Sequence, residues 1–295
     1  MYNLLIAPFA DNEFLRDALL GGVLAALICA VVGTFVVLRG LAFIADALAH
    51  GVLPGLAAAL LLGLSPLIGA AAGTVVMMAG VQVLTRRSRL MSDTAIGLFF
   101  AGMLALGVMI TSRSDSFTGD LTRVLFGELL GIDRQEILWQ SVALAAVAGI
   151  AWLCRRPFLL LCVDPDVAAT SGFRVRLYES VLLGMVALAV ISCFQAVGSL
   201  LVFGLLVAPA ATGSLFGRRI STVMVIAAVV VVGCVYAGLL LSYHADLAAG
   251  ACVVMLAVSV FLVAFAVMEV VRWRHRPAPL PPHTHSHPHP GEVAA

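Results

Sequence analysis

The chain has 295 residues, of which 62% are hydrophobic and 11% are charged, and its net charge is +1. Soluble domains are about 45–50% apolar and about 25% charged. This composition, with a mean hydropathy of +1.10, therefore excludes a water-soluble fold and predicts an integral membrane protein. The near-zero charge gives no indication of nucleic-acid binding. Every positive residue is an arginine, and because a P-loop requires a lysine, the chain contains no P-loop ATPase.

Apolar runs long enough to cross a bilayer begin at residue 17 and recur up to residue 271. They predict an all-α fold, a polytopic membrane bundle of about eight or nine transmembrane helices. Pro209 interrupts one run, so the number depends on whether that run crosses fully. The expected spans are residues 17–38, 41–62, 65–85, 93–111, 136–154, 178–196, 198–216, 220–241 and 247–271.

Arginine is distributed unevenly over the connections between these spans. One set of connections holds thirteen arginines and the other holds four. The four are Arg16, Arg113, Arg123 and Arg134. Because arginine-rich loops stay in the cytoplasm, we expect the N-terminus outside and the C-terminus inside. The chain then divides into an extracytoplasmic segment at 1–16, a transmembrane domain at 17–271 and a cytoplasmic tail at 272–295.

Asp46 and His50 lie inside the second expected span. Their spacing puts a carboxylate and an imidazole on one helical face, one turn apart, in a region where ionisable side chains are rarely without function. Pro54 has no N–H to offer the carbonyl of His50, so this oxygen is freed and the helix is expected to bend. These groups suit a transit site for a divalent metal. A proton relay and a purely structural Asp–His pair are the alternatives.

A second pair, His244 and Asp246, lies between the last two expected spans on the predicted outer side. Metal capture at the outer mouth and an ordinary solvated turn both fit it. The longest outer connection runs from Ser112 to Glu136 and carries acidic residues and arginines around a short apolar segment. Mixed charge of this kind suits the docking of a soluble partner protein, and it equally suits a solvated loop.

On the predicted cytoplasmic side, the sequence from Asp164 to Asp166 is a helix start, because an Asp N-cap is followed by Pro165 at the first helical position. Gly172 is then the expected C′ residue, and Arg174 follows it. A short interfacial helix of this kind is typical of a docking element for a cytoplasmic partner. A plain amphipathic connector is the alternative.

The tail at 272–295 is rich in proline and carries His283, His285, His287 and His289 at every second position. This composition cannot build a packed core, so we expect disorder. Alternating histidines in a flexible segment can bind Zn, Ni or Cu through several imidazoles. A cytoplasmic position suggests metal buffering or sensing rather than capture.

The segment LAFIADALAHGVLPGLAAALLLG resembles the second span of the zinc/manganese-type permeases of bacterial ABC importers, which has the pattern D-x-x-x-H-x-x-x-P-G. The segments DTAIGLFFAGMLALGV, LFGELL, VDPDVAATSGFRV and VGSLLVFGLLVAPAAT follow in that family's order, as does a D-x-x-A-G pattern that begins at Asp246. The resemblance covers about residues 17–270. Ala248 and Ala251 stand where the family usually has prolines.

This resemblance implies a homodimeric permease in a bacterial cytoplasmic (inner) membrane, with two cytoplasmic ATP-binding cassette subunits and one extracytoplasmic metal-binding protein. It also implies that Asp46 and His50 contact the metal, and that the segment around Asp164 to Arg176 couples the permease to its ATPase. The chain would then be a transport subunit rather than an enzyme, with no catalytic residue and no cofactor of its own.

We therefore expect the membrane subunit of an ATP-driven importer of a divalent metal, with Zn²⁺ first and Mn²⁺ next. The preference for zinc rests on the histidine tail, since imidazole suits zinc whereas carboxylate and carbonyl oxygens suit manganese. The alternative is a proton-coupled secondary metal transporter that uses Asp46 and His50. It predicts an internal repeat, yet no second Asp–His span is present. A membrane-embedded protease is disfavoured, because the chain has no H-E-x-x-H motif.

Overall fold

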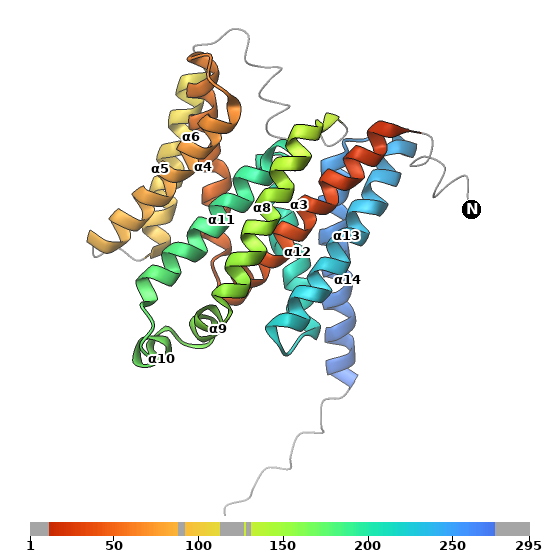
Figure 1. Cartoon of the computed structure of the whole chain (residues 1–295). Coiled ribbons are helices and arrows are strands. Elements are labelled where there is room, and N and C mark those ends of the chain that lie inside the picture. The colour runs from red at the N-terminus through yellow and green to blue at the C-terminus, as the bar shows by residue number, and fades with distance from the viewer. Residues whose placement is uncertain (1–11, 88–91, 113–126, 128–130, 275–295) are drawn as a thin grey trace, which may run out of the picture.

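The computed structural model describes residues 12–87, 92–112, 127 and 131–274, and within these ranges it contains helices and no β-strand. This confirms the predicted all-α membrane bundle (Figure 1). In chain order the helices are α3 (Glu13–Leu38), α4 (Ala42–Leu61), α5 (Pro66–Arg87), α6 (Ser92–Thr111), α8 (Arg134–Leu153), α9 (Arg155–Val163), α10 (Pro165–Thr170), α11 (Val175–Val197), α12 (Ser199–Phe216), α13 (Ile220–Ala245) and α14 (Ala249–Arg274).

Each expected span corresponds to one of these helices. The largest differences are four residues, where α3 begins at Glu13 rather than residue 17 and α13 ends at Ala245 rather than residue 241. Among the described residues, eight helices are long and apolar enough to cross a membrane. The shorter apolar helix is α12, which contains Pro209 and is the run whose crossing the sequence left open.

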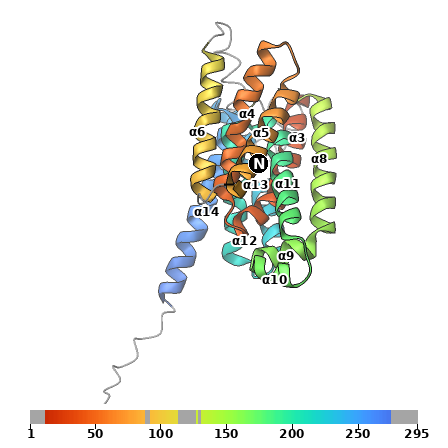
Figure 2. The same ribbon diagram turned by 90° about the vertical axis from the view of Figure 1, so that its left-hand side faces the viewer.

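Helix α3 lies at the centre of the bundle and packs against α8, α11, α12 and α13. Helix α4 packs against α5 and α6 on one side and against α11 and α12 on the other. Figure 2 shows α6 and α14 along one side of the molecule and α8 along the other. These three spans are also the least buried, as expected for helices that present apolar side chains to lipid.

Close contact between α4 and α5 depends on glycine. Gly51 and Gly55 on α4 face Gly69 and Gly73 on α5, and a methyl group added at Gly55 would collide with the carbonyl oxygen of Gly69. Without a hydrophobic driving force between helices in lipid, association depends on such close backbone packing. The glycines therefore hold α4, the helix that carries Asp46 and His50, tightly against its neighbour.

Two short helices, α9 and α10, lie at the lower end of the bundle in Figure 1. The Asp164 carboxylate accepts a hydrogen bond of 2.8 Å from the Asp166 amide and caps α10, with Pro165 at its first turn. The helix ends at Thr170, and Gly172 has a φ of 85°. This confirms the predicted Asp-capped helix with Gly172 as its C′ residue, a position that favours glycine because φ is positive.

Candidate metal transit site

Asp46 and His50 lie one turn apart on α4, as predicted, and both side chains are partly buried. His50 Nδ1 is 3.0 Å from the backbone oxygen of Asp46 and 3.6 Å from its carboxylate Oδ1. A carbonyl oxygen can only accept a hydrogen bond, so this geometry puts the proton on Nδ1. In the neutral imidazole Nε2 then keeps its lone pair, and Nε2 is the atom able to bind a metal.

The His50 imidazole is oriented by a second contact. Its ring makes an edge-to-face contact with Phe100 of α6, with centroids 5.1 Å apart and an interplanar angle of 74°. Next to it, Gly51 lies directly against Met77 of α5. The imidazole is therefore held from two sides, by its own helix through Asp46 and by α6 through the aromatic ring.

Pro54 lies one turn after His50 inside a continuous α4. Since proline has no N–H, the backbone oxygen of His50 lacks its usual intrahelical partner. The carboxylate of Asp46, Nε2 of His50 and this oxygen are the donors available at the site. Within the described ranges, no group of three or more His, Cys, Asp or Glu side chains is arranged to hold a metal ion. The pair is therefore too small a ligand set for a permanent metal centre and is suited to brief contact with a passing ion.

His244 and Asp246 lie at the exposed end of α13 and in the turn before α14. His244 Nδ1 is 2.8 Å from the Leu240 carbonyl oxygen of its own helix. Asp246 ends α13 with a φ of 52°, a left-handed conformation that Asp tolerates better than most residues. Both residues therefore already have a local role at a helix end, and metal capture there stays a prediction.

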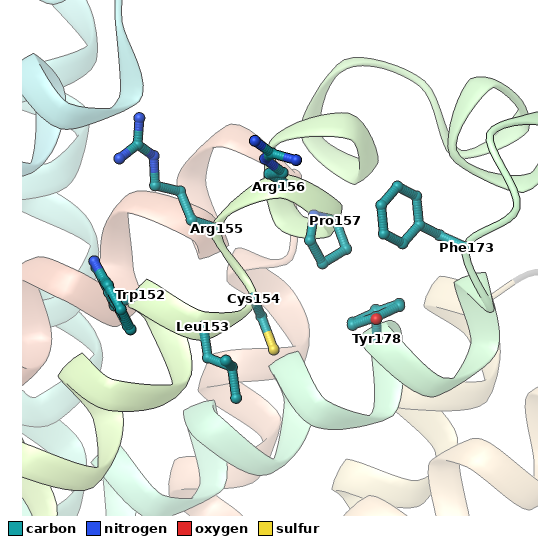
Figure 3. Close-up of a pocket in the computed structure, with 8 residues that line it drawn as sticks. All are labelled: Trp152, Leu153, Cys154, Arg155, Arg156, Pro157, Phe173 and Tyr178. Carbon is teal, nitrogen blue, oxygen red and sulfur yellow. The ribbon is translucent and has the colours of Figure 1, made fainter.

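A cavity of about 670 Å³ adjoins the α9–α10 segment. Figure 3 shows Phe173 and Tyr178 facing Pro157 across it, while the side chains of Arg155 and Arg156 point away from them. The rings of Phe173 and Tyr178 make an edge contact with centroids 5.8 Å apart. Arg174 is the residue before α11. The segment that the sequence singled out for docking therefore has an exposed, basic and partly aromatic surface.

Two sets of predicted residues lie outside the described ranges. These are the histidines of the tail, His283, His285, His287 and His289, and most of the connection from Ser112 to Glu136. The helix α14 extends to Arg274, three residues into the segment expected as a tail.

Sequence reasoning did not single out an ion pair that closes the same end of the bundle as α9 and α10. Arg39, in the turn between α3 and α4, donates to the Glu179 carboxylate of α11 at 2.9 Å and to the backbone oxygen of Leu161 in α9. A signal was present, because Glu179 is an acidic residue at the start of an otherwise apolar run. Its partner could not be identified from sequence, since the two residues are 140 positions apart.

Comparison with known proteins places these observations in a family. A model of the ABC 3 transport family matches residues 11–268. A probable iron transport system membrane protein of Haemophilus influenzae is 33% identical over 270 residues, which cover 92% of this chain and 99% of that protein. The manganese transport system membrane protein MntC of Listeria monocytogenes is 34% identical, over 89% of this chain and 93% of that protein. The structure is also similar to PsaBC from Streptococcus pneumoniae, solved in complex with Fab, with a TM-score of 0.83 and 28% identity over 93% of this chain and all of that one.

Proposed function

We propose, from the premise that the chain belongs to the ABC 3 transport family, that Asp46 and His50 form the site through which a divalent metal ion crosses the membrane. The chain is the permease subunit of a metal importer, and ATP hydrolysis takes place in a separate subunit. The observation that carries the proposal is the His50 imidazole, whose Nδ1 is held by Asp46 so that Nε2 is free to bind the ion.

We take the transported metal to be manganese or iron ahead of zinc. The relatives reported above are named for iron and manganese transport, and the expectation of zinc is not confirmed. That expectation depended on the histidine tail, which the described ranges do not include. A carboxylate, one imidazole and a backbone oxygen form a mixed donor set that serves Mn²⁺ and Fe²⁺ as well as Zn²⁺.

A site with few ligands suits the transport of a metal ion better than its permanent binding. Two side chains bind an ion too weakly to retain it, so the ion can leave when the helices rearrange. A homodimer would bring two Asp46–His50 pairs toward one pathway, and we include this dimer in the proposal. A purified transporter that contains a single permease chain, as measured by native mass spectrometry, would rule the dimer out.

The α9–α10 segment is the proposed seat of the ATPase. Its second helix, α10, is capped by Asp164, begins with Pro165 and Asp166, and is followed by Gly172 and Arg174. The side chain of Val167 is exposed on α10 while Ala168 is buried. One face of this short helix is thus fixed to the permease and the other is available to a partner. An extracytoplasmic metal-binding protein, which would deliver the ion at the outer side, completes the proposed assembly.

The decisive experiment measures uptake of radioactive Mn²⁺, Fe²⁺ and Zn²⁺ by cells that carry the complete transporter, with wild-type permease or the variants Asp46→Asn and His50→Ala. We expect each variant to lower uptake of the physiological metal by about tenfold or more, as loss of a metal-orienting group commonly does. Asp93→Asn, which removes an exposed carboxylate at the start of α6, is the matched control and should transport normally. Normal uptake by both site variants would show that the pair is structural.

The proton-coupled alternative receives no support. The family match places the chain with ATP-driven transporters. The internal repeat that a secondary transporter requires is also not evident in the sequence, where one span alone carries an Asp–His pair.

A further inference from the structure

A cavity of about 220 Å³ lies among α4, α5, α6 and α11, beside the turn that joins α3 to α4. It lies at the end of the bundle that carries α9 and α10, because Arg39 lines it and also bonds to the Leu161 carbonyl of α9. Its polar lining consists of Arg39, Gln82, Thr85, Glu179 and Ser180.

The cavity lies directly along the helices from the Asp46–His50 pair. On α4 it is lined by Ile44, and on α6 by Ile96. The His50 imidazole contacts Phe100, which is one turn further along α6 than Ile96. At 1.5 Å per residue, the cavity is therefore about 6–9 Å from the His50–Phe100 contact, on the α9–α10 side. An ion that leaves the pair toward the cytoplasm would enter this space next.

The side chains of the cavity offer oxygen atoms. Besides the Glu179 carboxylate they include the Gln82 amide oxygen, which accepts a 3.3 Å hydrogen bond from Ser180, and the hydroxyl of Thr85. The lining contains no histidine or cysteine. Oxygen donors suit Mn²⁺ and other hard divalent cations better than they suit zinc.

Glu179 is the one acidic residue of the lining, and it is more exposed than Arg39, its partner in the ion pair. The Arg39 side chain is 12% exposed and has a second bond, to Leu161, whereas the Glu179 side chain is 42% exposed. Arg39 is thus fixed in place and keeps its bond to the Leu161 carbonyl, whereas the more exposed Glu179 is the partner that can turn into the cavity. A cation that arrives between them would attract the carboxylate and be repelled by the guanidinium.

We infer that Glu179 is an exit residue for the transported ion, with Arg39 as its resting counter-ion. The Glu179 carboxylate exchanges Arg39 for the ion that leaves Asp46 and His50. The positive charge of Arg39 then favours release of the ion toward the cytoplasm, after which the 2.9 Å pair forms again. This inference rests on the proposed function, since it requires an ion that passes along α4.

The test compares Glu179→Gln and Glu179→Asp in the complete transporter reconstituted in proteoliposomes. It measures Mn²⁺ transported and ATP hydrolysed in the same sample. We expect Glu179→Gln to lower Mn²⁺ transport per ATP about tenfold, the lower end of the loss seen when a metal-orienting oxygen is removed. Glu179→Asp keeps a carboxylate in the cavity and should transport close to wild type. Glu269→Gln, at an exposed position near the end of α14, is the matched control.

A purely structural ion pair predicts a different pattern. In that case Glu179→Gln and Glu179→Asp would impair transport together, because each breaks the 2.9 Å contact. That result, or unchanged transport by Glu179→Gln, overturns the inference. If Glu179→Gln does not assemble, Glu179→Asp decides by the same rule, since impaired transport by this variant indicates a structural pair and retained transport indicates the exit role. Failure of the proposed function is separate, because it appears as normal metal uptake by the Asp46→Asn and His50→Ala variants, whatever the Glu179 variants do.

Discussion

At the scale of single residues, a few polar groups in an apolar bundle are held by specific contacts. His50 is held by Asp46 and Phe100, and Arg39 is held by Glu179 and the Leu161 carbonyl. Such groups are costly to place within a membrane unless their partners are provided. Asp46 lies one turn from His50 on the same helix, whereas the other partners come from helices that are distant in sequence.

The thiol of Cys154, at the end of α8, allows a test of orientation. Burial raises the pKa of this thiol, so less thiolate is present at neutral pH than in a free cysteine. The thiolate is the reactive form, so labelling of Cys154 by a membrane-impermeant maleimide should be slow at neutral pH. As long as the pH is below the pKa, the labelling rate should increase about tenfold with each unit by which the pH is raised. We expect labelling only when the reagent reaches the cytoplasmic side.

The measurement compares intact spheroplasts with opened membranes and subtracts the signal of a Cys154→Ser variant. Labelling of Cys154 in intact spheroplasts would place the α9–α10 end outside the cell and reverse the predicted topology. A rate that does not depend on pH would contradict the raised pKa.

At the scale of elements, the position of α4 depends on its packing against α5. The facing glycines of the two helices let their backbones touch, and any side chain at these positions forces the helices apart. Because α4 carries Asp46 and His50, a shift of this helix also displaces the proposed transit site.

Gly55→Ala should therefore destabilise the permease by about 1–3 kcal/mol, the usual cost of an extra methyl group in a packed core. Thermal unfolding in detergent measures this effect, and metal uptake should fall in parallel. The control is Gly149→Ala on α8, where an added methyl group meets no atom within 4 Å. A Gly55→Ala variant as stable as the control would show that α4 and α5 have more freedom than the structure implies.

At the scale of the whole molecule, the permease works only with subunits that this chain does not contain. The ATPase of this family is a separate subunit, so the energy for transport must come from outside this chain. The short α9–α10 segment at one end of the bundle is connected to the α3–α4 turn through Arg39 and Leu161. A movement of a bound ATPase therefore has a direct contact through which it can act on α4.

Val167→Asp replaces an exposed apolar side chain of α10 with a charge, on the face proposed to contact the ATPase. We expect the tagged permease to retain its thermal stability and yet recover several-fold less ATPase subunit on affinity purification. Val167→Ala, which keeps the surface apolar, is the control. Equal recovery of the ATPase with Val167→Asp would exclude this face of α10 from the interface.

The sequence by itself determined the membrane class, the extent of the spans and the α10 cap, because hydropathy, arginine placement and the Asp164–Pro165 start are local properties. It also placed Asp46 and His50 on one face, since a spacing of four residues is decided within one helix. Only the tertiary structure decided that Phe100 holds the His50 ring and that Glu179 meets Arg39 beside a cavity. These features depend on how separate helices pack, and helices in lipid are oriented by backbone contacts such as Gly55 against Gly69, which no pattern within a single span specifies.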